Sequence, residues 1–123
     1  MKYLCLVYYD ERKLDALSNG EYDTLVGEVL AYRDVLRKSG HYIVSDGLQS
    51  VHTATTIRIR NGKVLTTDGP FAETAEQLGG FMLIEARDLN DAIRVASKIP
   101  PVRLGCIEVR PLRELQPPRP RPI

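Results

Sequence analysis

Apolar residues near the start of the chain follow the period of a β-strand. Cys5 and Val7 fall on one face of such a strand, and Leu4 and Leu6 fall on the other. A strand that is apolar on both faces is buried on both sides. The pattern therefore predicts a central strand over residues 3–9.

Two later segments have the three-and-four spacing of amphipathic helices. In residues 21–39 the apolar positions recur along one helical face, and Ser18 and Glu21 have the spacing of a capping box. In the second segment Asp88 precedes the apolar positions as a possible N-cap, and Pro100 ends the pattern. Each helix has an apolar stripe that must be buried against a sheet.

Residues 53–67 have the pattern of a β-hairpin. Asn61-Gly62 is the dipeptide preferred in a two-residue type I′ turn, where both central positions need a positive φ. The resulting register pairs Ile59 with Val64 on one face of the hairpin. The other face is rich in arginine and lysine, which indicates solvent or a nearby anion.

Further strands are expected near residues 42–45, 80–86 and 104–110. The order is then strand, helix, several strands, helix, strand, and both helices need the same face of one sheet. We predict an α+β fold with a ferredoxin-like βαββαβ plan and an extra β-hairpin. The opposite sheet face also carries apolar side chains, so we expect a homodimer with stacked sheets.

Length and charge place the chain among small neutral domains. Its 123 residues suit one domain, which we assign to residues 1–115, and the Pro/Arg-rich residues 116–123 are expected to form an extended tail. A formal net charge of +1 gives no basis for binding nucleic acid or a membrane surface. Since the N-terminal apolar run is too short for a signal peptide, we expect a cytoplasmic protein.

Neither cysteines nor histidines suggest a cofactor. Cys5 and Cys106 lie in apolar strand patterns, so both are expected to be buried thiols. His41 and His52 are isolated and have no HxxxH, HxH or CxxC context. The sequence therefore predicts no metal site and no cofactor.

The segment after the hairpin holds the first-rank candidate residues. Asp68 begins a turn with Gly69, and a structural role in this turn would by itself explain why these two residues are present. The acidic residues Asp68 and Glu73 could also act as acid and base if they share an enclosed space. In that interpretation Gln77 lies in the same polar loop, and Phe71 buries its ring to anchor it.

Other side chains are candidates for ligand binding. They are Tyr9, Asp46, His52 and Arg110, in addition to Gln77. Arg110 offers a planar fork that suits a carboxylate or phosphate. It also lies two residues from Glu108 on the same strand face, so an ion pair between the two is the alternative.

The segment 66–81, with Asp68-Gly69-Pro70-Phe71 near its start, resembles the signature of the DGPF family, a branch of the YciI-like (YCII-related) proteins. Shorter matches in the same order extend the resemblance over residues 1–115. It implies a ferredoxin-like fold of the dimeric α/β-barrel type in a bacterial cytoplasmic protein. No general reaction is associated with this branch, so the resemblance leaves open whether the chain is an enzyme.

The resemblance also bears on mechanism and partners. Some YciI-like proteins have a proposed His–Asp pair with the histidine on the first helix, but residues 21–39 contain no histidine here. We therefore predict a dimeric small-molecule-binding protein or enzyme with a polar pocket at the DGPF loop. The alternative is a non-catalytic interaction module linked to an alternative sigma factor, since family members are often encoded beside such factors.

Overall fold

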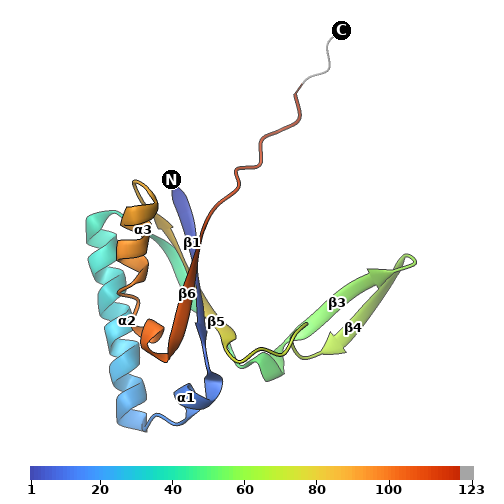
Figure 1. Cartoon of the computed structure of the whole chain (residues 1–123), viewed down its shortest axis with the longest axis horizontal. Coiled ribbons are helices and arrows are strands. Elements are labelled where there is room, and N and C mark those ends of the chain that lie inside the picture. The colour runs from blue at the N-terminus through green and yellow to red at the C-terminus, as the bar shows by residue number, and fades with distance from the viewer. Residues whose placement is uncertain (120–123) are drawn as a thin grey trace.

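The computed structural model describes residues 1–119 and shows a main sheet with helices on one side and a hairpin on the other (Figure 1). The main sheet has four antiparallel strands in the order β2-β5-β1-β6. Its strands are β1 (Lys2–Tyr9), β2 (Tyr42–Gly47), β5 (Gln77–Glu85) and β6 (Gly105–Pro111). The α+β class is thus confirmed, and the strand order is compatible with a ferredoxin-like plan.

The helices α2 and α3 cover the same face of this sheet (Figure 1). The helical elements are α1 (Glu11–Asp15), α2 (Asn19–Ser39) and α3 (Leu89–Ala96), with short 3₁₀ turns η1 (Val51–Thr53) and η2 (Pro100–Leu104). The capping box of Ser18 and Glu21 is present at the start of α2. Gly40 ends this helix with a φ of 82°, a left-handed conformation that glycine adopts without a steric penalty.

The core lies between the main sheet and the helices α2 and α3. Its fully buried side chains include Cys5 of β1, Ile84 of β5 and Val95 of α3. Because side chains alternate along a strand, the intervening residues of β1 and β5 point to the side that carries no helix. This side of the sheet is called the bare face below.

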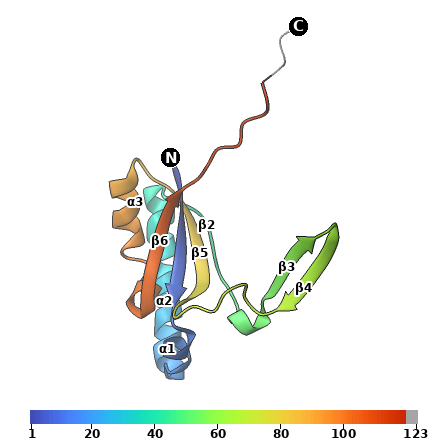
Figure 2. The same cartoon turned by 45° about the vertical axis from the view of Figure 1, so that its right-hand side comes forward.

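The hairpin forms a second, separate sheet of β3 (Thr55–Arg60) and β4 (Lys63–Asp68). Ile59 pairs with Val64, as the turn predicts. Asn61 and Gly62 have φ values of 51° and 75°, so the expected turn chemistry is confirmed. The hairpin extends away from the main sheet on the side opposite the helices (Figure 2).

Several expectations are corrected. The third main strand begins at Gln77, three residues before the predicted start, and α1 was not expected. Cys106 is exposed because β6 turns it toward the bare face, whereas Cys5 points into the core as predicted. The two free thiols therefore lie on neighbouring strands but on opposite faces of the sheet.

The segment between the hairpin and β5 also differs from expectation. Phe71 is 80% exposed, so its predicted burial is wrong, because this segment lies between hairpin and body without packing its ring on either. The predicted tail falls partly outside the described residues, which end at 119, and residues 116–119 are in neither helix nor strand. Among residues 1–119, no helix has the length and apolarity needed to cross a bilayer.

Candidate functional site

A cleft of about 240 Å³ opens between α2 and the main sheet. Apolar side chains of β1 and β5, including Val7 and Met82, form its floor, and Leu25 of α2 forms part of its wall. At its mouth α2 presents Val26 and Leu30, which remain partly exposed. The cleft therefore suits a small, mainly apolar ligand.

One end of the cleft is shaped by the contact of Tyr9 with Gly79. A Cβ atom on Gly79 would lie 2.1 Å from Cζ of Tyr9, so the ring occupies the space that any side chain there would need. The Tyr9 hydroxyl donates a hydrogen bond of 3.4 Å to the Gly79 carbonyl. Burial, and then the nearby Glu11 carboxylate, raise the pKa of Tyr9, so its hydroxyl is a donor rather than a base.

Arg33 of α2 brings a cationic group to this apolar cleft. Its Nε atom is buried and has no hydrogen-bond partner among the described residues. Its Nη2 atom is 3.5 Å from the carbonyl of Ser45, which is at the long limit for a hydrogen bond. A buried donor without a partner is uncommon because its desolvation is uncompensated, and a ligand acceptor would supply what is missing.

Of the predicted site residues, Tyr9 and Asp46 line this cleft. Asp68 and Glu73 are exposed and lie outside it, and His52 is an exposed residue of η1. In the single chain, the structure therefore does not bring the two acidic candidates together with the cleft.

Arg110 lies on β6 and forms an ion pair with Glu108, as the alternative interpretation predicted. Both follow the alternation that places exposed Cys106 on the bare face. Arg110 is thus separated from the cleft by the sheet itself.

The Asp68-Gly69 step ends the hairpin. Asp68 pairs with Thr55 as the last residue of β4, and Gly69 follows with a φ of 97°. The Gly69 N–H donates to the Ala54 carbonyl at 2.7 Å, and its own carbonyl accepts from the Thr56 hydroxyl at 2.8 Å. The turn interpretation of this motif therefore has direct structural support.

Gln77 has a positioning role at the start of β5. Its Oε1 atom accepts a hydrogen bond of 2.9 Å from the Glu11 N–H. The Glu11 carboxylate in turn accepts from the Val51 N–H at 2.8 Å and the Ser50 hydroxyl at 2.9 Å. These contacts tie α1 and η1, and hence the base of the hairpin, to the main sheet.

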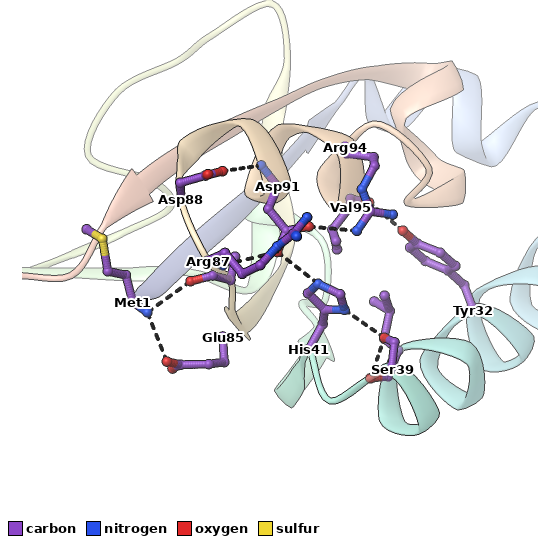
Figure 3. Close-up of polar contacts among 12 residues, drawn as sticks. Met1, Tyr32, Ser39, His41, Glu85, Arg87, Asp88, Asp91, Arg94 and Val95 are labelled. Carbon is purple, nitrogen blue, oxygen red and sulfur yellow. Dashed lines mark hydrogen bonds and ion pairs between the residues drawn. The ribbon is translucent and has the colours of Figure 1, made fainter.

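A second polar cluster links the C-terminal end of α2, the segment after β5 and the first turn of α3 (Figure 3). His41 Nε2 lies 3.0 Å from Asp91 Oδ2, and His41 Nδ1 lies 2.7 Å from the Ser39 hydroxyl. The buried Asp91 carboxylate also accepts from the Arg87 N–H at 3.1 Å and from Arg94 Nη2 at 2.6 Å. The connectivity resembles a Ser–His–Asp relay.

The surroundings of Ser39 do not suit acyl transfer. Its hydroxyl also donates to the Leu36 carbonyl at 3.1 Å, and one proton cannot serve both that carbonyl and His41. The N–H groups of Gly40 and His41 donate to helix carbonyls, so they cannot stabilise an oxyanion. The C-terminal end of a helix also carries partial negative charge. We therefore assign the cluster a structural role.

Sequence reasoning missed Arg33 and Asp91. Arg33 follows Val29 by four residues, so a charged residue within the apolar stripe of the helix was the available signal. Asp91 lies three residues after the N-cap Asp88, where a carboxylate is ordinary. Nothing in the local sequence shows that it meets His41, which is 50 positions away.

The structure defines a small α+β domain in which α2 and α3 cover one face of an antiparallel sheet and an open cleft lies between α2 and that sheet. The chain matches the model of the YCII-related domain over residues 1–116. It is also 34% identical over 119 residues to an uncharacterized protein of Rhizobium meliloti (strain 1021), covering 95% of this chain and 96% of that relative. The chain belongs to the YCII-related family, which confirms the predicted resemblance.

Proposed function

We propose that the chain binds a small, mainly apolar molecule with an acidic group in the cleft between α2 and the sheet. The unpartnered, buried Nε of Arg33 is the observation that carries this proposal. A carboxylate in the cleft would accept a charge-assisted hydrogen bond from the Arg33 guanidinium once this side chain turns its buried Nε toward the ligand, and the apolar remainder would contact Val7, Leu25 and Met82.

Tyr9 would complete the recognition of such a ligand. Its hydroxyl bond to Gly79 is long at 3.4 Å, so little is lost when it turns to a ligand oxygen. The side-chain polar groups of the cleft include the Arg33 cation, the Tyr9 phenol and the exposed Asp46 carboxylate, and the first two suit binding of an anion better than proton abstraction. Proton chemistry at Asp68 and Glu73 stays a prediction, because neither lines the cleft of the single chain.

Removing the Arg33 guanidinium tests the proposal. We expect Arg33→Met, which keeps the length and apolar stem, to weaken binding of simple carboxylates such as hexanoate and benzoate at least tenfold. The reason is the loss of a charge-assisted hydrogen bond worth about 1.5–3 kcal/mol. NMR titrations that follow the Gly79 and Gly80 amides, which line the cleft, provide the measurement.

Arg37→Met is the matched control, since Arg37 lies one turn further along α2, pairs with Asp34 and stays outside the cleft. Hexanol and benzamide serve as uncharged probes. If hexanoate and benzoate leave the glycine amides unchanged, or if Arg33→Met binds them as well as the wild type, the proposal is wrong.

A further inference from the structure

We propose that the β3–β4 hairpin is an arm by which two copies of this chain pair, with its apolar face covered by the second copy. The proposal is independent of the ligand in the cleft. It rests on how the hairpin is held, on which of its faces is apolar, and on where it lies relative to the bare face of the main sheet.

Within residues 1–119, the hairpin is tied to the rest of the chain only at its base. Its two strands bond to each other and to no strand of the main sheet. A two-stranded hairpin alone in water is at best marginally stable, and it gains stability when one face packs against another element. A regular six-pair ladder from Thr55↔Asp68 to Arg60↔Lys63 therefore implies a cover that residues 1–119 of the single chain do not provide.

One hairpin face has the composition of a contact surface. Ile57, Ile59 and Val64 share it, and they are 64%, 71% and 64% exposed. The opposite face carries Leu65 across from Arg58 and, at the last pair before the turn, Arg60 facing Lys63. Like charges on that face oppose stacking and edge-to-edge pairing, so the apolar face is the one that docks.

The same side of the molecule presents a second uncovered apolar surface. The bare face carries Leu4 and Leu6 of β1 and Phe81 and Leu83 of β5, all only partly buried. The hairpin leaves the body on this side, so hairpin and sheet border a common space (Figures 1 and 2). Because both surfaces belong to one molecule, a two-fold pairing covers both of them at once in each copy.

The areas agree with a stable dimer. One face of a hairpin with six-residue strands measures about 20 Å by 10 Å, and a four-stranded sheet of this length about 25 Å by 19 Å. Together these faces give about 700 Å² per copy, close to the roughly 800 Å² that each partner buries in a standard interface. The bare face by itself provides only about 500 Å², so the arm makes a substantial part of the contact.

A charge placed on the apolar face of the arm tests the proposal. We expect the wild type to have the mass of two chains in light scattering at micromolar concentration. Ile59→Glu should shift it to the mass of one chain at the same concentration, with an unchanged helical circular dichroism signal because the hairpin contains no helix and lies outside the core. Hydrogen exchange supplies a second readout: the hairpin amides should be protected at high concentration and lose protection on dilution.

Val35→Glu is the matched control, since Val35 is 57% exposed on α2 and lies on neither proposed surface. It should remain a dimer. A wild-type mass of one chain overturns the proposal and leaves a partner of another sequence to cover the arm. A dimer that survives Ile59→Glu, or hairpin protection that does not change on dilution, excludes the arm from the interface and leaves dimerisation to the sheet.

Discussion

Replacing Asp91 with asparagine is expected to lower the melting temperature by on the order of 10 °C. Asp91 is 4% exposed, and its carboxylate joins the Arg87 N–H, the Arg94 guanidinium and the His41 ring. Asparagine keeps the size but loses the charge and turns one acceptor into a donor that faces other donors. The start of β2, the end of β5 and α3 would lose their common contact.

The loss of thermal stability caused by Asp91→Asn should be larger at neutral pH than at acidic pH. The hydrogen bond from the Arg87 N–H, followed by that from Arg94, holds the pKa of Asp91 well below its usual range. Since an unfolded aspartate titrates near about 4, the stabilisation is complete above that pH and is lost as pH falls toward the folded value. Thermal unfolding should therefore show a full difference between wild type and Asp91→Asn at pH 7 and a smaller one at pH 3.

The control for this prediction is Asp23→Asn, which changes an exposed carboxylate on α2. Its melting temperature should stay close to that of the wild type at both pH values. A difference between wild type and Asp91→Asn that is equally large at pH 7 and pH 3 would show that the carboxylate charge is not what stabilises the cluster.

The sequence predicted those structural features that depend only on residues close together in the chain. The capping box of Ser18 and Glu21 and the turn at Asn61-Gly62 each depend on a few neighbouring residues, and the structure has both. The hairpin register followed from the turn type alone. Its position on the bare-face side did not, because nothing local determines where a hairpin points once it leaves the main sheet.

The cleft could be predicted only in part, for the same reason. Tyr9 and Asp46 were expected at a site, but Arg33 was not, since its role depends on how closely α2 approaches the sheet. The choice of Asp68 rested on turn chemistry that serves a hairpin end and a ligand site equally well. Phe71 shows that residue type alone does not determine burial. An aromatic residue favours burial, yet this ring is exposed in the single chain.

The close approach of β6 to β1 leads to a second large effect, at Gly105. Gly105 pairs with Tyr9 across the sheet, and a Cβ atom there would lie 2.0 Å from the carbonyl oxygen of Tyr8 and 2.7 Å from Cα of Tyr9. Both are backbone atoms, which cannot swing aside as a side chain can. We expect Gly105→Ala to lower the free energy of unfolding by about 3 kcal/mol, the upper part of the usual range for overpacking.

Urea unfolding measures this change, with Gly27→Ala as the matched control. A Cβ on Gly27 meets nothing within 4 Å, and the residue lies inside α2, so alanine there should raise the free energy of unfolding by about 1 kcal/mol. The glycine-to-alanine substitution is therefore expected to lower the free energy of unfolding at position 105 and to raise it at position 27. Because Gly105 borders Tyr9, the alanine should also displace that end of the cleft and weaken carboxylate binding. Equal stabilities for Gly105→Ala and the wild type would mean that the two strands do not approach this closely.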